Sequence, residues 1–230
     1  MKDITGSVAL VTGGNRGLGR ATVEELLTRG VAKVYATARH PEPSDDPRIV
    51  PLALEVTDDD AIASVAAAAS DVTIVVNNAG IVGTRESLLQ TTPTNLQQVF
   101  ATNVFAPLRI AQAFAPILAA NRNGTLVDIH SAVSWAPGFG VYGASKAAFW
   151  SLTNSLRVEL ATQGTLVIGV HLGFADTDLT AALDVPKIDP RDVARAIVNG
   201  IEQEQPEVLV DEASRYIKSL LSGPVEDLHF

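Results

Sequence analysis

The sequence predicts an α/β fold, built on one doubly wound parallel β-sheet of about seven strands with helices on both faces. Two observations predict it. Short apolar runs with little polar alternation, such as Val8-Ala9-Leu10-Val11 and Thr73-Ile74-Val75-Val76, indicate strands that are buried on both faces of a sheet. Most of these runs are followed by a segment with helical spacing of apolar residues, as expected when helices connect parallel strands.

Seven short apolar runs are the expected strands. Glycine, proline or polar residues bound most of them, which is typical of strands joined by turns and helices. In chain order they cover residues 8–11, 34–37, 49–54, 73–76, 125–129, 166–172 and 207–210. The polar segment 41–48 indicates a surface loop and not a domain boundary, so residues 1–230 are expected to form one domain.

Between most of these strands, apolar residues recur at helical spacing, so a helix is expected there. The expected helices cover residues 19–29, 57 onward, 93–120, 140–161, 190–202 and 211–221. Gly30 ends the first helix, and Thr57 is expected to cap the second, whose opening aspartates suit a helix N-terminus. Pro107 and Pro116 are expected to kink or interrupt the third, whereas Pro190 fits the first turn of its helix.

Composition narrows the class of function. The 230 residues carry a net charge of -9, which argues against nucleic acid and anionic membrane surfaces as partners. There is no cysteine, so thiol chemistry is not expected. The four histidines show no metal-ligand spacing, so no metal is expected; these histidines are His40, His130, His171 and His229. We found no signal-peptide pattern and no apolar run of membrane-spanning length, and we expect a cytoplasmic protein.

A glycine-rich loop joins the first strand to the first helix. Its sequence is Thr12-Gly13-Gly14-Asn15-Arg16-Gly17-Leu18-Gly19. Glycines allow a tight turn and a close approach of a pyrophosphate to the backbone, while the helix N-terminus supplies free N–H groups. An ordinary glycine turn is the alternative, but the strand-to-helix position favours a dinucleotide site on a Rossmann-type fold. The contacts are expected from Gly13, Asn15, Arg16, Gly17, Leu18 and Gly19.

The ends of the second and third strands bear on the choice of cofactor. A carboxylate after the second strand would bind a ribose 2′-hydroxyl, but the chain has Thr37-Ala38-Arg39 there. Arg39 and Arg16 can pair with a 2′-phosphate, which favours NADP(H) over NAD(H), although both could be solvated surface arginines. Glu55 and Val56 end the third strand beside the expected adenine, where Glu55 either accepts from the adenine amino group or is simply solvated.

Tyr142 and Lys146 lie four residues apart in an expected helix, and therefore on one face of it. A fixed cation beside a phenol favours the phenolate and lowers the pKa of the tyrosine. That change would let Tyr142 exchange a proton near neutral pH. The pair alone is a weak signal, because the spacing is common.

The Tyr142–Lys146 pair becomes a specific signal because it is one of four sequence landmarks that occur in a fixed order. They are the loop from Thr12 to Gly19, Asn77-Asn78-Ala79-Gly80, Asn103 in Thr102-Asn103-Val104, and Tyr142 with Lys146. On these residues the chain resembles the classical short-chain dehydrogenase/reductase family, in particular its carbonyl reductases. The landmarks cover the chain to about residue 150, and Gly173 with Thr177 extends the match, although Leu172 replaces the usual proline.

The resemblance implies a role for each matching residue. Ser131 would hold the substrate carbonyl oxygen, with Ser134 as a second candidate because His130 and a short following segment depart from the family pattern. Tyr142 would donate the proton, Lys146 would bind the nicotinamide ribose, and Asn103 would hold a water near Lys146. Asn77 is expected to hold strands together. The remaining matches are expected to contact the cofactor; they are Asn78, Ala79, Gly80, Gly173 and Thr177.

The expected substrate loop, residues 178–189, is short and indicates an open pocket for a small or medium carbonyl compound. Its apolar wall is expected from Trp135, Phe139, Phe174 and Leu179, with core packing as an equal alternative. We therefore expect an NADPH-dependent aldehyde or ketone reductase. The alternatives are an alcohol or sugar dehydrogenase that works oxidatively and a nonenzymatic nucleotide-binding regulator. The family resemblance also implies a homodimer or homotetramer.

Overall fold

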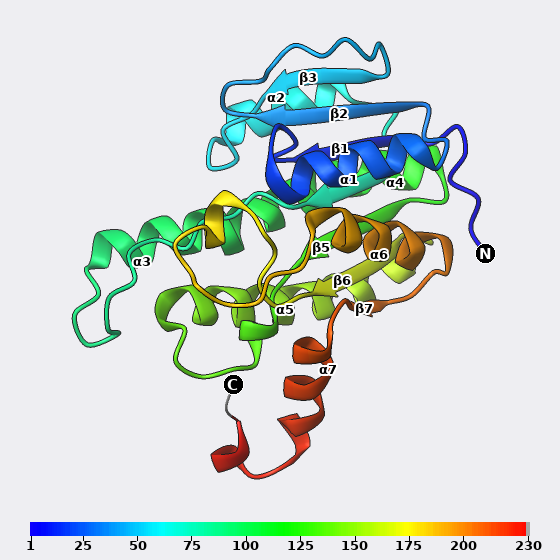
Figure 1. Cartoon of the computed structure of the whole chain (residues 1–230). Coiled ribbons are helices and arrows are strands. Elements are labelled where there is room, and N and C mark those ends of the chain that lie inside the picture. The colour runs from blue at the N-terminus through cyan, green and yellow to red at the C-terminus, as the bar shows by residue number, and fades with distance from the viewer. Residues whose placement is uncertain (229–230) are drawn as a thin grey trace.

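One parallel sheet runs through the computed structural model, which describes residues 1–228 (Figure 1). Its seven strands lie in the order β3-β2-β1-β4-β5-β6-β7, and every neighbouring pair is parallel. The strands are β1 (Val8–Thr12), β2 (Lys33–Ala38), β3 (Ile49–Ala53), β4 (Ile74–Asn77), β5 (Thr125–Ile129), β6 (Leu166–His171) and β7 (Glu207–Leu209). The order reverses between β1 and β4, which is where such sheets bind their ligands. The predicted fold class is confirmed.

Helices cover both faces of the sheet (Figure 1). They are α1 (Gly17–Thr28), α2 (Asp59–Ala68), α3 (Pro93–Phe100), α4 (Ala106–Asn121), α5 (Gly140–Ala161), α6 (Pro190–Glu202) and α7 (Glu212–Ser219). Helices α1 and α6 share one apolar layer, and α2, α4 and α5 share the other. Strand β1 divides its side chains between these layers, because Ala9 and Val11 point to the first and Leu10 to the second.

The predicted boundaries agree with the structure to within a few residues, but one cap differs. Helix α2 is capped by Asp58, whose carboxylate accepts hydrogen bonds from the backbone N–H groups of Asp60 and Ala61. The expectation that Thr57 caps this helix is therefore wrong. Thr57 instead donates its hydroxyl to the carboxylate of Glu55, 2.9 Å away.

The long helical stretch 93–121 is interrupted, although neither proline marks the interruption itself. A π-helical turn, Ala101–Phe105, separates α3 from α4 and carries Asn103. Pro107 occupies the first turn of α4, where its missing N–H costs little. Pro116 lies inside α4, which continues past it to Asn121.

The same stretch corrects the expectation about membrane-spanning length. Residues Pro93–Asn121 form one helical segment that is long and apolar enough to cross a membrane by length and composition alone. In the structure Ile110, Phe114 and Leu118 are buried in the apolar layer that α4 shares with α2 and α5. This placement is that of a core helix of the domain.

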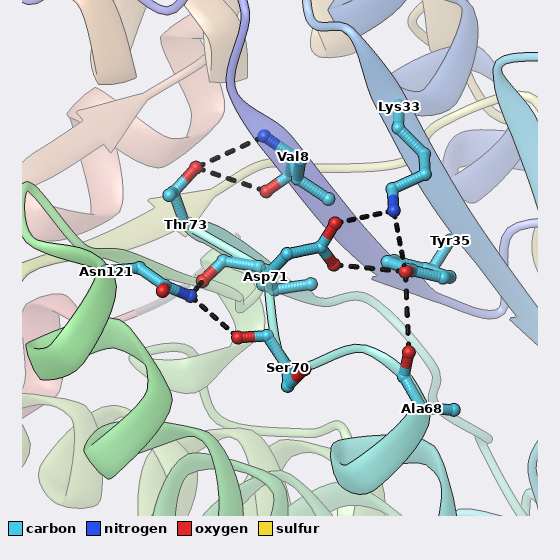
Figure 2. Close-up of polar contacts among 9 residues, drawn as sticks. Val8, Lys33, Tyr35, Ala68, Ser70, Asp71, Thr73 and Asn121 are labelled. Carbon is cyan, nitrogen blue, oxygen red and sulfur yellow. Dashed lines mark hydrogen bonds and ion pairs between the residues drawn. The ribbon is translucent and has the colours of Figure 1, made fainter.

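A polar cluster closes the edge of the sheet where the strands begin. Figure 2 shows the Tyr35 hydroxyl between Lys33 and Asp71, at 2.8 Å from the lysine Nζ and 3.0 Å from the carboxylate. Asn121 of α4 donates to the backbone oxygens of Ser70 and Val72 in the same loop. These contacts tie β2 and α4 to the connection between α2 and β4.

Replacing Tyr35 with phenylalanine is expected to lower the free energy of unfolding by about 1 kcal/mol, because it removes the central hydroxyl and leaves the ring packed. Urea unfolding of both proteins measures the difference. Tyr216→Phe is the matched control, since Tyr216 is about half exposed, and it should not change the midpoint. Equal midpoints for the parent and Tyr35→Phe would show that this cluster adds no stability.

Candidate active site

A cavity of about 820 Å³ lies where the strands end. Its lining includes residues just after β1, β2, β4, β5 and β6, which parallel strands bring to one edge of the sheet. Nearly all the residues predicted for the site line it: Gly13, Asn15, Arg16, Gly17, Leu18, Gly19, Arg39, Glu55, Val56, Asn78, Ala79, Gly80, Ser131, Phe139, Tyr142, Lys146, Gly173, Phe174, Thr177 and Leu179. Of the predicted residues, Asn103 and Trp135 are not in this lining.

The glycine loop presents backbone to the cavity. Helix α1 begins at Gly17, and its N-cap, Arg16, makes no side-chain capping bond to the N-terminal amides. Gly17 has φ +53, which favours glycine, and a Cβ there would lie 3.2 Å from Thr177. A Cβ at Gly19 would lie 2.1 Å from the Gly13 oxygen. An uncapped helix N-terminus behind close-packed backbone fits the pyrophosphate of a dinucleotide.

Two asparagines hold neighbouring strands in place. The Asn78 side chain donates to the Thr12 carbonyl at 2.8 Å, and the Thr12 hydroxyl accepts from the Asn78 and Ala79 amides. Asn77 on β4 donates to the Asp128 carboxylate on β5 at 2.9 Å. The expected role of Asn77 in holding strands together is confirmed by this bond.

Of the two arginines predicted to bind a 2′-phosphate, one is paired with a carboxylate at the cavity and the other is not. Arg39 is exposed, and within residues 1–228 no carboxylate forms an ion pair with it. Arg16 forms an ion pair with Asp178 at 3.0 Å, with both side chains largely exposed. Asn15 donates to the His40 carbonyl at 2.8 Å, which links the glycine loop to the segment after β2. Arg39 is therefore the arginine available to an anion.

Tyr142 and Lys146 lie on one face of α5, with the lysine Nζ 5.9 Å from the tyrosine ring centroid. Burial raises the pKa of Tyr142 to about 12, partly offset by a hydrogen bond with Ser131. The expected lowering of the Tyr142 pKa is therefore wrong for the protein alone, because the loss of solvation outweighs the hydrogen bond with Ser131. Lys146 is buried and donates to the Ile129 carbonyl at 2.8 Å.

Ser131, and not Ser134, faces the cavity. It follows β5 and caps the short 3-10 turn Ala132–Ser134, where its Oγ accepts from the Val133 amide at 3.3 Å. Ser134 is buried outside the cavity lining, and its hydroxyl finds no hydrogen-bond partner within the described part of the chain. Of the two candidate serines, only Ser131 is therefore in position to meet a ligand in this cavity.

Asn103 is buried in the π-helical turn, on the far side of Gly80 from Lys146. Its side chain donates to the Ile81 carbonyl and the Ser145 hydroxyl and accepts from the Ile81 amide. A Cβ at Gly80 would lie 3.3 Å from the Asn103 Oδ1 and 3.8 Å from the Lys146 Nζ, so these two groups flank Gly80. The water expected at Asn103 stays a prediction.

The turn after β6 is held by a residue that the sequence analysis did not single out. The Gly173 amide donates to the Asp211 carboxylate at 2.8 Å, and a Cβ at Gly173 would lie 2.7 Å from that oxygen. Glycine is thus required here for Asp211, which also caps α7. The only signal in the sequence is its place after the last strand. Leu172, in place of proline, accepts from the Ala132 amide at 2.8 Å, which holds the turn.

The apolar wall of the cavity contains three of its four predicted members. Phe139 and Phe174 face each other with ring centroids 6.4 Å apart, and Leu179 is partly exposed beside them. For Trp135 the alternative of core packing is the correct one: it stacks on His171 at 3.9 Å and is buried in a separate apolar cluster with Ile217. Arg85, which no motif marks, lines the cavity and donates to the Leu179 carbonyl at 3.3 Å.

Two of the four histidines are core residues. His130 and His171 are buried with ring centroids 4.8 Å apart, and burial lowers the pKa of His171 to about 3, so it is neutral at physiological pH. His229 lies outside the described residues. Within residues 1–228, no group of three or more His, Asp and Glu side chains is arranged to hold a metal ion.

Comparison with known proteins finds relatives in sequence and in fold. The family model described as short chain dehydrogenase matches residues 7–187. The 3-oxoacyl-[acyl-carrier-protein] reductase FabG of Vibrio cholerae is 34% identical over 221 residues, covering 85% of this chain and 89% of that protein. A short chain dehydrogenase from Burkholderia cenocepacia, solved in complex with NADP, has a TM-score of 0.90 at 33% identity, over 96% of this chain and 95% of that one.

A more distant structure extends the fold comparison. The short chain dehydrogenase/reductase of Burkholderia phymatum, solved in complex with NAD, has a TM-score of 0.88 at 21% identity and covers 100% of this chain and 98% of that one. At this identity the likeness concerns the fold. The two solved complexes hold different cofactors, so the comparisons do not choose between NADP and NAD.

Proposed function

Because this chain belongs to the short-chain dehydrogenase/reductase family of oxidoreductases, we propose that it is an NADPH-dependent reductase of small or medium aldehydes and ketones, with alcohol oxidation as the reverse reaction. The observation that carries the proposal is the meeting of Ser131, Tyr142 and Lys146 at one cavity with the glycine loop. When bound, the dihydronicotinamide cofactor would supply the hydride.

The chain's own residues account for the rest of the chemistry. The Ser131 hydroxyl donates to the substrate carbonyl oxygen, and Tyr142 gives that oxygen its proton as negative charge develops there. With a pKa of about 12, Tyr142 is protonated at neutral pH and ready to act as an acid. Lys146, whose pKa burial lowers to about 8, is still mostly protonated and binds the ribose hydroxyls. The protonation states thus suit reduction.

The preference for NADPH rests on Arg39. Its guanidinium stands at the end of β2 without a carboxylate partner among the described residues, where a 2′-phosphate would supply one. No acidic residue follows β2 until Glu42. Around the rest of the cofactor, the residues in position to bind it are those of the glycine loop with Asn78, Ala79, Gly80 and Thr177.

The substrate class follows from the wall and the lid of the cavity. Phe139, Phe174 and Leu179 offer an apolar surface of a size suited to a small or medium carbonyl compound. The lid is the loop 178–189, and its end is tied back to the turn after β6, because the Ile188 amide donates to the Phe174 carbonyl and the Ile188 carbonyl accepts from the Asp176 amide. The proposal takes from the Vibrio cholerae relative only the ketone group that its name implies.

We also propose that the protein assembles as a homodimer or homotetramer. Phe105, which ends the π-helical turn before α4, and Val158 on α5 are large apolar side chains that are 52% and 74% exposed. A second copy of the chain would remove this apolar surface from water.

The test is an assay that follows loss of dihydronicotinamide absorbance with NADPH and NADH in parallel, across aldehydes and ketones of increasing size. We expect turnover with NADPH, and kcat/KM that falls once the substrate outgrows the apolar wall. Binding of NADPH without turnover of any carbonyl compound would argue for a nucleotide-binding regulator. Faster turnover with NADH would remove the cofactor part of the proposal.

A further inference from the structure

Behind the catalytic residues lies a buried carboxylate. Asp128 on β5 is fully buried, and its two oxygens accept from the Asn77 amide at 2.9 Å and the Thr153 hydroxyl at 2.7 Å. Both donors are neutral. A buried carboxylate held only by neutral donors is costly unless a cation lies near it.

One face of α5 supplies that cation. Lys146, Phe149 and Thr153 follow one another at helical spacing, so all three point toward β5. The Lys146 ammonium donates to the Ile129 carbonyl, and Thr153 donates to Asp128, one residue earlier on the same strand. The lysine and the carboxylate therefore share the interface between α5 and β5, both shielded from solvent.

Two cations act on Asp128, and Lys146 has the larger effect: the charge of Arg157 also lowers the pKa of Asp128, but by less. Arg157, also on α5, commits its guanidinium to the carbonyls of Val167 and Pro206 and to the side chain of Asn154. His130 directly follows β5 and His171 ends β6, and burial lowers the pKa of both, so they are neutral. Strand β4 presents only the amide of Asn77.

We propose that Asp128 is a positioning residue of the reaction: its buried negative charge keeps Lys146 protonated and sets the pH at which the Tyr142–Lys146 pair releases its proton. The catalytic consequence rests on the proposed function, whereas the coupling of the two charges does not. The pKa shifts agree in direction, since the Asp128 charge raises the pKa of Lys146 and the lysine lowers that of Asp128, against the larger effect of burial on each.

The first test is Asp128→Asn, which removes the charge and keeps the shape. Asn77 can still donate to the remaining oxygen. The new amide can donate to Thr153, whose hydroxyl proton then turns from residue 128 to the Phe149 carbonyl, 3.0 Å away. Removing a negative charge lowers the pKa of every neighbouring group. The basic limb of the kcat/KM profile for carbonyl reduction should therefore move down by about one pH unit.

Thr153→Ser is the matched control, because it removes a methyl group from the same buried interface but keeps the charge of Asp128 and the hydroxyl that donates to it. It should leave the basic limb in place even if it lowers stability. The proposal would be overturned if the basic limb of the kcat/KM profile did not move in Asp128→Asn. It would also be overturned if the limb moved equally in the Thr153 variant, because a purely structural role of Asp128 predicts one of these two results.

A reciprocal test needs no turnover. Carbon-13 NMR of labelled aspartate carboxyls gives the pKa of Asp128, which is about 6 in the parent protein, and the same titration is made on Lys146→Met. Loss of the ammonium should raise this pKa, and an unchanged value would overturn the proposal. This titration can be made even if Asp128→Asn does not fold or no carbonyl substrate is found. An unchanged Asp128 pKa would therefore count against the charge coupling alone and not against the proposed function.

Discussion

Tyr142→Phe is expected to lower kcat for carbonyl reduction by about a thousandfold, within the range measured for removal of a general acid. The reason is local. Tyr142 is the phenol that lines the cavity together with Ser131 and Lys146, and its raised pKa of about 12 means that it enters the reaction carrying its proton. Phenylalanine keeps the ring but has no proton to give. Steady-state kinetics with NADPH and the best carbonyl substrate measure the loss.

The affinity for NADPH separates this result from damage to the fold. It should stay nearly constant in Tyr142→Phe, because the glycine loop and Arg39 are untouched, and fluorescence titration of bound NADPH checks it. Tyr216→Phe, at a half-exposed tyrosine outside the cavity, is the matched control and should keep full activity. A kcat close to that of the parent would mean that another group supplies the proton.

Arg39→Asp should reverse the cofactor preference. The parent guanidinium would make charge-assisted bonds to the 2′-phosphate, so its loss should weaken use of NADPH by about 10- to 100-fold. The new carboxylate repels that phosphate and can accept from the 2′-hydroxyl of NADH. The ratio of kcat/KM values for the two cofactors at one substrate concentration measures the reversal.

Arg20→Asp is the control for this experiment. It changes the charge by the same amount on the exposed side of α1, where Arg20 pairs with Glu24 and does not line the cavity. The cofactor ratio should not move. If Arg39→Asp also keeps the parent preference, Arg39 does not select the cofactor, and Arg16, after leaving Asp178, becomes the next candidate.

Local sequence patterns predicted most of the fold and most of the residues around the cavity. Strand β1 and helix α1 follow from an apolar run and from helical spacing around a glycine loop, which act over a few residues. Parallel strands end at one edge of their sheet, which is why motifs far apart in the chain, such as the loop at Gly13 and the Tyr142 helix, meet at one cavity. Those inferences require no knowledge of side-chain packing.

The errors and the open alternatives arose where neighbours that are distant in sequence decide the outcome. Trp135 sits next to cavity residues in the chain, yet it turns away to stack on His171. Asp58 rather than Thr57 caps α2, because the cap depends on which side chain reaches the first free amides. The choice between Ser131 and Ser134 likewise required the direction of each hydroxyl.

The sequence by itself determined the order of strands and helices, the glycine loop and the Tyr142–Lys146 spacing, because these depend on propensity and on residues within one or two turns. Only the tertiary structure decided the electrostatics of the site. Burial in the wall of the cavity raises the pKa of Tyr142, which the sequence predicted to fall, and the packing of α5 on β5 lets the charges of Lys146 and Asp128 shift each other's pKa. Solvation and charge coupling act through space, and the distances concerned exist only once β5 and α5 have packed together.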